Sequence, residues 1–324
     1  MKTSIVRRLA CAALLAGVAG AHAEPAGYPD RPVRIVVPYT PGGATDTVAR
    51  SIASQLSTRW GQPVIVENRG GASGMIGAAA VAKAQPDGYT LVLADSAPFV
   101  ILPSLHADMA YDPLKDFASI TVVARQVPIL VVSSKLPVHS VKELVAYLKA
   151  HPNTPYGSLG PGSYPHVAME AFQQLSGTRM LHVPYKGTAQ VTTDMIGGQV
   201  SLYIGTLGAF QQQEKAGTVR ILAVATQQRV SLRPDLPTVA EAGVPGFAVN
   251  VWFGLAGRAG TPAGILDKIH ADVQAVLRDR HFVEEVLLPQ ALTPGGDSRA
   301  DFGDLMRSDT ERWRQSIQSA GIKL

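Results

Sequence analysis

Short apolar runs alternate along the chain with segments whose apolar residues recur at helical spacing. The first run, Val33–Val37, is rich in β-branched residues, and the turn Tyr39-Thr40-Pro41-Gly42-Gly43 follows it. Ala44–Arg59 then has the period of a helix with one buried face. The same order returns several times before residue 225. Helices between short buried strands predict an α/β fold with parallel strands and right-handed crossovers.

Two longer apolar runs predict that the chain passes between two lobes. Phe117–Ser133 contains two strand patterns in one extended stretch, and Val249–Ala256 is a second such stretch. We therefore expect a first lobe from residues 24–124 and 251–324 and a second lobe from residues 125–250. Three C-terminal helical patterns are expected to pack on the first lobe, namely Ala263–Asp279, His281–Leu288 and Arg299–Ala320.

Turns of glycine and hydroxyl residues follow the strands of both expected lobes. Their N–H and O–H donors are Thr40, Gly42, Gly43, Ser96, Ser158, Gly162, Ser163, Gly187 and Thr188. In open α/β sheets, ligands bind outside the carboxyl ends of the strands. Neutral donors there suit a carboxylate, because charge-assisted hydrogen bonds are strong and need no buried countercharge. An ordinary connection is the simpler interpretation of one turn, but five such turns favour a cleft between facing lobes.

Several residues beside these turns have two interpretations each. Asp46 and His166 lie at helix starts and could contact a ligand. A helix cap is the favoured interpretation for Asp46, and packing against the turn is favoured for His166. Tyr39 and Tyr185 suit the wall of a cleft and the core of a lobe equally well. Lys186 could pair with an anion or point to solvent.

Residues 1–23 have the pattern of a secretory signal peptide. A basic start precedes the apolar run Leu9–Gly20, and Ala21-His22-Ala23 fits a cleavage site. The apolar run is shorter than the roughly 20 residues needed to span a bilayer. Cys11 lies inside the run rather than after it, which disfavours lipidation. We therefore expect cleavage after Ala23 and a soluble, exported protein.

Composition narrows the classes of partner. Three of the 29 basic residues belong to the signal, which leaves 26 basic against 25 acidic residues in the mature chain. A net charge so close to zero gives no reason to expect nucleic acid or an anionic membrane as partner. Cys11 is the only cysteine, so we expect neither a disulfide nor thiol chemistry in the mature chain.

Motifs of metal and cofactor enzymes do not occur in the sequence. It has no HExxH zinc motif, no phosphate-binding GxxxxGKS or GxxxxGKT loop, no complete GxGxxG and no GxSxG nucleophile turn. We therefore expect no metal, no cofactor and no catalytic residues. An exported hydrolase is the alternative, and it would need a nucleophile and a base brought together from distant positions.

Five long stretches carry a resemblance to one family. They are residues 28–50, YPDRPVRIVVPYTPGGATDTVAR; residues 61–91, GQPVIVENRGGASGMIGAAAVAKAQPDGYTL; residues 182–190, HVPYKGTAQ; residues 236–247, LPTVAEAGVPGF; and residues 252–262, WFGLAGRAGTP. Because of these stretches, the chain resembles the substrate-binding proteins of tripartite tricarboxylate transporters, the Bug family of extracytoplasmic solute receptors. The resemblance implies a two-lobed, type II-like periplasmic binding protein fold with two crossover segments.

The resemblance also implies a function and a set of site residues. A monomer in the periplasm would hold a small organic carboxylate and deliver it to membrane permease components. In the family, one carboxylate is gripped by the loop matching Thr40–Gly43 and by second-lobe turns, here Ser158–Ser163 and Gly187–Ala189. The expected ligand-binding residues are Tyr39, Thr40, Pro41, Gly42, Gly43, Ser96, Ser158, Gly160, Gly162, Ser163, Tyr185, Gly187, Thr188, Ala189, Gly205 and Thr206, with Asp46, Tyr164 and His166 as further candidates. A receptor that reports the ligand to a signalling partner fits the same residues.

Two positions depart from the family pattern. Many members have a turn rich in serine and asparagine where this chain has Ser158-Leu159-Gly160-Pro161-Gly162-Ser163-Tyr164-Pro165. Many also carry an aspartate at the strand end matching residues 203–206, where this chain has Gly205. Because that aspartate accepts from an amino or amide group, its absence implies a ligand without an ammonium group. In the turn, Leu159, Pro161, Tyr164 and Pro165 remove polar groups or an N–H donor and add bulk, which implies a ligand larger or more apolar than an amino acid.

Overall fold

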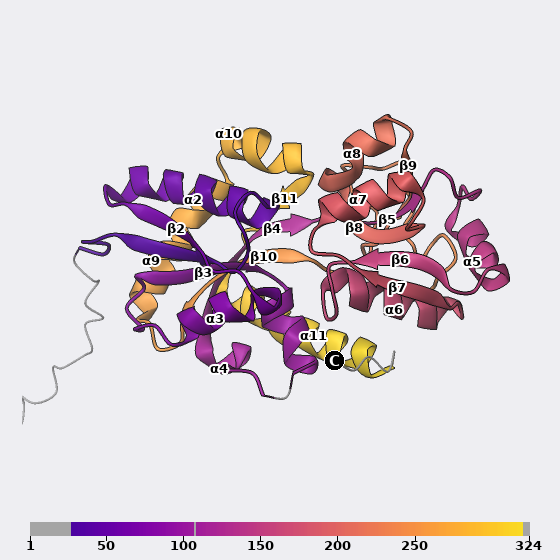
Figure 1. The fold of residues 1–324 in the computed structure, drawn as a ribbon. Coiled ribbons are helices and arrows are strands. Elements are labelled where there is room, and N and C mark those ends of the chain that lie inside the picture. The colour runs from indigo at the N-terminus through magenta and orange to yellow at the C-terminus, as the bar shows by residue number, and fades with distance from the viewer. Residues whose placement is uncertain (1–26, 107, 320–324) are drawn as a thin grey trace, which may run out of the picture.

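The computed structural model describes residues 27–106 and 108–319, so the signal segment 1–23 lies outside the described residues. These residues form two β-sheets flanked by helices, which gives the two-lobed α/β architecture of Figure 1. The first sheet contains β1 (Val33–Val37), β2 (Val64–Asn68), β3 (Thr90–Asp95), β4 (Phe117–Gln126), β10 (Trp252–Arg258) and β11 (Leu292–Pro294). The second contains β5 (Pro128–Ser133), β6 (Thr154–Ser158), β7 (Met180–Pro184), β8 (Leu202–Thr206) and β9 (Val219–Val224).

The helices follow the strands in the same division. Those of the first lobe are α2 (Ala44–Trp60), α3 (Met75–Ala82), α4 (Pro113–Asp116), α9 (Ala263–Leu277), α10 (Arg280–Phe282) and α11 (Arg299–Ser319). Those of the second lobe are α5 (Val141–Ala150), α6 (Tyr164–Ser176), α7 (Thr188–Gly197) and α8 (Leu207–Lys215). Short helical turns complete the fold: η1 (Ala72–Gly74), η2 (Ala97–Ile101), η3 (Leu102–Ser104), η4 (Val283–Leu287) and η5 (Leu288–Gln290).

Both sheets are mixed rather than purely parallel. The first has the order β11-β4-β10-β3-β1-β2, in which β1 pairs in parallel with β2 and β3, but β10 is antiparallel to β3 and β4. The second has the order β7-β6-β8-β5-β9, in which β5 is antiparallel to both neighbours. The expected parallel sheet was therefore wrong for β5 and β10. These two strands enter their sheets from the other lobe and not through a helical crossover.

Local sequence explains the first strand–helix unit. The side chains of β1 are buried except at Arg34. Helix α2 buries one face against the sheet and α9, with Val48, Ile52 and Leu56 fully covered. It ends at Gly61, whose φ of 63° is the left-handed conformation that stops a helix with little strain in glycine. The alternation of apolar positions thus fixes which face of each element meets the core.

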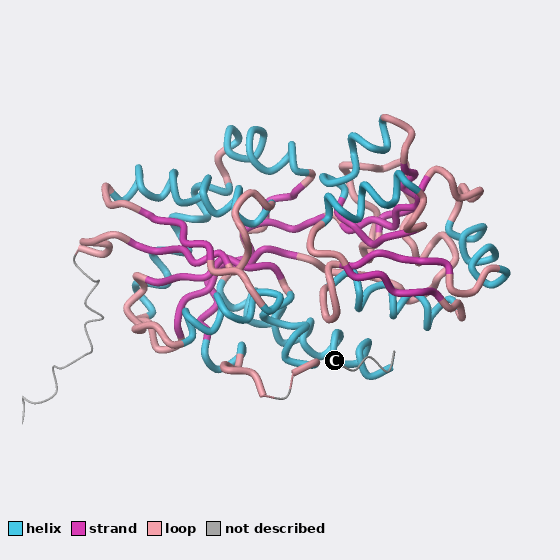
Figure 2. Tube along the Cα trace, viewed as in Figure 1, coloured by secondary structure: helices cyan, strands magenta, loops and turns pink. Residues whose placement is uncertain are grey.

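The two crossovers lie side by side between the lobes (Figures 1 and 2). Val127 alone separates β4 in the first sheet from β5 in the second, and the chain returns just before Trp252. Helix α11 packs on β4 and also on α6 of the second lobe. The C-terminal helices therefore cover the first lobe, and the last of them also spans the junction.

The expected helix over His281–Leu288 was wrong in detail. A short helix, α10, is followed by the wide turn η4 and the tight turn η5. Leu288, the residue before Pro289, still has helical backbone with φ −61° and ψ −39°, so helical turns continue past residue 288. Ala291 then adopts a φ of 51°, which ends the helical backbone. The periodicity was present, but the hydrogen-bonding pattern changes from one turn to the next along the segment.

Candidate functional site

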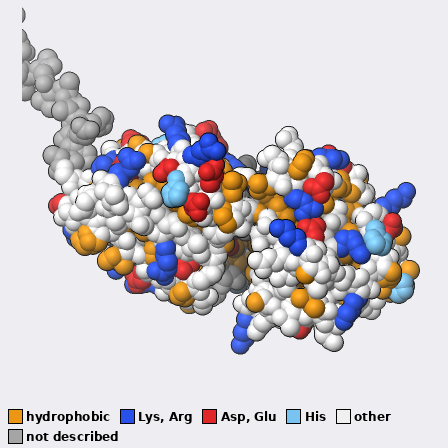
Figure 3. Space-filling model, turned by 90° about the horizontal axis from the view of Figure 1, so that it is seen from above, with side chains coloured by type: hydrophobic (Ala, Val, Ile, Leu, Met, Phe, Trp, Pro, Cys, Tyr) orange, Lys and Arg blue, Asp and Glu red, His pale blue; other side chains and the backbone are white. Residues whose placement is uncertain are grey.

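Carboxyl ends of strands from the two sheets face each other across the middle of the molecule. β1 and β3 end there in the first lobe, and β6, β7 and β8 end there in the second (Figures 1 and 2). Each of these strands continues into a turn that begins a helix or helical turn. Seen from above, a narrow groove separates the two lobes (Figure 3). The turns with the expected site residues lie at these strand ends.

Helix α2 presents its N-terminus on the first-lobe side. Gly43 caps the helix in extended conformation, and no neighbouring atom lies within 4 Å of the point where a side chain would begin. Thr40, Pro41 and Gly42 are exposed. The first N–H groups of a helix have no partners within it and attract anions. This loop therefore offers open backbone donors to a carboxylate.

Asp46 holds this loop in place. Its carboxylate accepts from the Gly42 N–H at 2.9 Å, from Arg50 Nε at 3.0 Å and from Asn68 Nδ2 at 2.9 Å. Burial opposes ionisation, but these hydrogen bonds outweigh it and lower the pKa of Asp46. The Asp46 carboxylate therefore shapes the loop from behind. In this conformation the Gly42 N–H is directed at Asp46 and not at the groove.

The facing turn, Ser158–Ser163, is held by its own hydrogen bonds. Ser163 Oγ donates to the Gly160 carbonyl at 2.6 Å, and the Gly160 N–H donates to Ser158 Oγ at 3.0 Å. The Gly162 N–H donates to His166 Nδ1 at 3.2 Å. The packing interpretation of His166 therefore describes its place: its imidazole lies against the turn. Gly160 has a φ of 97° and open space at its side-chain position.

A second histidine supports the same turn. His182 Nε2 lies 2.5 Å from Ser158 Oγ, and its ring stacks on His166 with centroids 4.2 Å apart. Burial, and then the neighbouring His166, lower the pKa of His182 to about 4. His182 is therefore neutral at pH 7. The sequence contained it in the family stretch HVPYKGTAQ, but nothing local indicated its contact with Ser158.

Helix α7 supplies a second open N-terminus, from the second lobe. Gly187 caps it in extended conformation, again with no atom within 4 Å of its side-chain position. Thr188 is partly exposed and Ala189 is exposed. Tyr185 turns away to donate to Asp194 at 2.7 Å. Of this stretch, the backbone at residues 187–189 is the part that faces open space.

Gly205 is closed to side chains by packing. A Cβ there would lie 2.5 Å from the ring of Phe210 and 2.9 Å from that of Tyr203, both buried. An aspartate at this position would therefore collide with the core of the second lobe. Thr206, the next residue, is partly exposed and caps α8 without a side-chain hydrogen bond.

The end of β3 contributes an acidic group that was not among the expected site residues. Tyr39 Oη donates to Asp95 Oδ1 at 2.6 Å, and the Ala97 N–H donates to the same oxygen at 2.8 Å. Ser96, an expected site residue, is fully buried, and its Oγ has no hydrogen-bond partner among the described residues. The strand-end position of Asp95 was a usable signal, but only its neighbour was selected from it.

Residues 27–106 and 108–319 contain no group of histidine, cysteine, aspartate or glutamate side chains that could hold a metal ion. Within the same ranges, no helix is both long and apolar enough to cross a membrane.

A sequence model described as "Tripartite tricarboxylate transporter family receptor" matches residues 48–322. The chain belongs to this receptor family. Protein BugT of Bordetella pertussis is 33% identical over 325 residues, which cover 99% of each chain. The family resemblance drawn from the sequence is therefore confirmed.

Solved structures agree with the receptor's fold. One is the R. palustris protein Rpa4515 with adipate, 37% identical, with a TM-score of 0.84 over 91% of this chain and 99% of that chain. Another is MatC from Rhodopseudomonas palustris with bound malate, 30% identical, with a TM-score of 0.79 over 90% and 100% of the two chains. The expected two-lobed fold is confirmed by these similarities.

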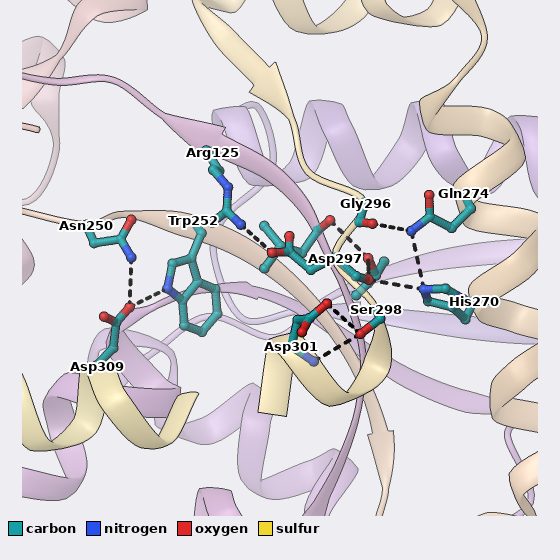
Figure 4. Close-up of polar contacts among 12 residues, drawn as sticks. Arg125, Asn250, Trp252, His270, Gln274, Gly296, Asp297, Ser298, Asp301 and Asp309 are labelled. Carbon is teal, nitrogen blue, oxygen red and sulfur yellow. Dashed lines mark hydrogen bonds and ion pairs between the residues drawn. The ribbon is translucent and has the colours of Figure 1, made fainter. Parts of the chain in front are cut away.

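Polar contacts fix both crossover strands of the receptor to its C-terminal segment (Figure 4). Arg125, near the end of β4, pairs with Asp297 at 2.5 Å. Asn250 and Trp252, at the return crossover, donate to Asp309 of α11 at 3.1 and 2.9 Å. Burial raises the pKa of Asp309. A change in the angle between the lobes would therefore bend the crossover backbone next to this ion pair and these hydrogen bonds.

Proposed function

We propose that this receptor captures a small organic carboxylate between its lobes and delivers it to the permease components of a tripartite tricarboxylate-type transporter in the membrane. The observation that carries the proposal is the pair of open helix N-termini, α2 at Gly43 and α7 at Gly187, at facing strand ends. Backbone N–H groups there provide charge-assisted hydrogen bonds without a buried cation. The adipate and malate bound by two relatives are ligands of this class.

The site we propose combines the expected residues of both lobes. The backbone of Thr40–Gly43 meets the carboxylate from the first lobe, and the turns Ser158–Ser163 and Gly187–Ala189 meet it from the second. Asp46 and His166 act behind their turns and do not touch the ligand. The lobes close on the ligand by bending at the two crossovers, beside Val127 and near Asn250.

We further propose a periplasmic monomer, cleaved after Ala23, that catalyses nothing. One observation favours an exported hydrolase instead, namely the 2.5 Å contact between Ser158 Oγ and His182 Nε2. A general base works best with a pKa near the working pH. Burial and His166 lower the pKa of His182 to about 4, and Ser158 is fully buried. Binding therefore explains this contact better than turnover does.

A thermal-shift screen of mono-, di- and tricarboxylates and aromatic acids tests the proposal. A ligand at one hundred times its Kd stabilises the folded state by about 2.7 kcal/mol. In a chain of this size, where the entropy of unfolding is about 0.6 kcal/mol/K, that raises Tm by roughly 4 °C. If no acid raises Tm and none co-purifies with the receptor, the proposal fails. Chemical change of any bound acid would instead support the hydrolase.

A further inference from the structure

Asp95 has one carboxylate oxygen fully engaged and the other free of protein donors. Oδ1 accepts from both Tyr39 Oη and the Ala97 N–H. The described residues provide no hydrogen bond to Oδ2, and the side chain keeps partial exposure. A hydrogen-bond acceptor is therefore available at the end of β3, beside the Tyr39–Gly43 loop.

Ser96 provides a second, independent observation at the same place. Its side chain is 0% exposed, and its Oγ has no partner among the described residues. Nearly all buried polar atoms in folded proteins are hydrogen-bonded, so this hydroxyl has an unmet hydrogen bond for a water molecule or for a ligand group that enters beside it. Asp95 and Ser96 are consecutive, and they place an acceptor and a hydroxyl at one strand end.

The second lobe faces this pair with Tyr164. The Tyr164 ring is buried, and the nearby Tyr203 and Asp95 add to burial in holding the pKa of its hydroxyl well above the usual range. Tyr164 also belongs to the same buried apolar cluster as Ala97, the residue after Ser96.

No basic side chain among the described residues pairs with Asp95. Arg50, the basic residue of the neighbouring loop, is bound to Asp46 and Asn68. Ion pairs of described residues involve other carboxylates. Burial raises the pKa of Asp95. In its ionised form, a carboxylate without a cationic partner repels the second carboxylate of a plain diacid and attracts a hydroxyl or ammonium group.

We propose that Asp95 and Ser96 form a subsite that recognises a hydrogen-bond donor on the ligand. The proposal rests on the proposed function, in which α2 and α7 hold a carboxylate. It assigns the ligand to the carboxylates that carry a hydroxyl or amino group near the bound carboxylate. The absence of a side chain at Gly205 suggested a ligand without an ammonium group, but Asp95 provides an acceptor from the opposite lobe.

The test compares acids that differ by a single group. Each acid that binds in the carboxylate screen is titrated calorimetrically beside its analogue without the hydroxyl or amino group. Suitable sets are malate, aspartate and succinate, and phenyllactate, phenylalanine and phenylpropionate. We expect the donor-bearing acid to bind at least tenfold more tightly than the plain acid. The hydroxyl and amino arms then show which donor is preferred.

Variants separate recognition from structural support. Asp95→Asn keeps the size of the side chain and removes its charge, so the preference should fall to less than threefold. Ser96→Ala should reduce the preference in the same direction. Tyr39→Phe removes the hydrogen bond to Oδ1 but keeps the carboxylate. If Asp95 only positions Tyr39, Tyr39→Phe will abolish the preference as well; if the proposal holds, the preference persists.

The outcomes are distinct. Equal binding of plain and donor-bearing acids by the wild type overturns this proposal and leaves the proposed function intact. A preference that survives in folded Asp95→Asn also overturns it. If no carboxylate binds at all, the proposed function fails first. Melting temperatures without ligand show that each variant is folded.

Discussion

Replacing Gly43 with valine should block ligand binding without disturbing the fold. Gly43 has φ −79° and ψ 168°, an extended conformation that any residue adopts, and its side-chain position is open. Each charge-assisted hydrogen bond contributes about 1.5–3 kcal/mol. The loss of one such bond raises Kd by roughly 10- to 150-fold. A surface change of this kind shifts stability by about 0.5 kcal/mol or less.

Gly42 provides the control for backbone strain in the same loop. Its side-chain position is equally open, but its φ of 92° is strained for any residue with a Cβ. Gly42→Ala should therefore destabilise the loop by about 1–2 kcal/mol, whereas Gly43→Ala should not. Calorimetric titration gives Kd, and thermal melting without ligand gives stability. An unchanged Kd in folded Gly43→Val would remove the α2 N-terminus from the site.

Three further outcomes follow from the packing and charges. Gly205→Asp should cost about 1–3 kcal/mol in chemical denaturation, because the new Cβ would lie 2.5 Å from Phe210; unaltered stability would contradict this packing. Asp309→Ala should cost about 1–3 kcal/mol by leaving the buried Trp252 Nε1–H unpaired, and Asp309→Asn should cost clearly less. The fold favours neutral His182, so the unfolded chain takes up a proton first. The contribution of neutral His182 to the free energy of unfolding should therefore be fully present above about pH 6.5 and be lost as the pH falls towards 4. In melting curves, His182→Gln should flatten this decline.

The parts of the fold that depend on near neighbours could be predicted from the sequence. A β-branched run, a glycine turn and a helical period follow one another within residues 33–60, and the structure has β1, a loop and α2 there. The Glu143 N–H donates to Ser140 Oγ, and this capping interaction likewise depends on two residues only three positions apart. Such features form because adjacent residues alone determine them.

The features that depend on distant residues could not be predicted. Tyr39 meets Asp95 across 56 positions, and Ser158 meets His182 across 24. The antiparallel entry of β10 depends on how the second lobe returns the chain, which periodicity does not encode. Gly205 looked like a missing ligand residue, and only the position of Phe210 showed that no side chain fits there.

A crystal structure of the receptor with the carboxylate that gives the largest thermal shift tests the central claim most directly. We expect the lobes to close on one ligand, with its carboxylate within hydrogen-bonding distance of the backbone N–H groups at the starts of α2 and α7. A ligand bound outside the space between the lobes, or a carboxylate held by side-chain cations, would contradict the account.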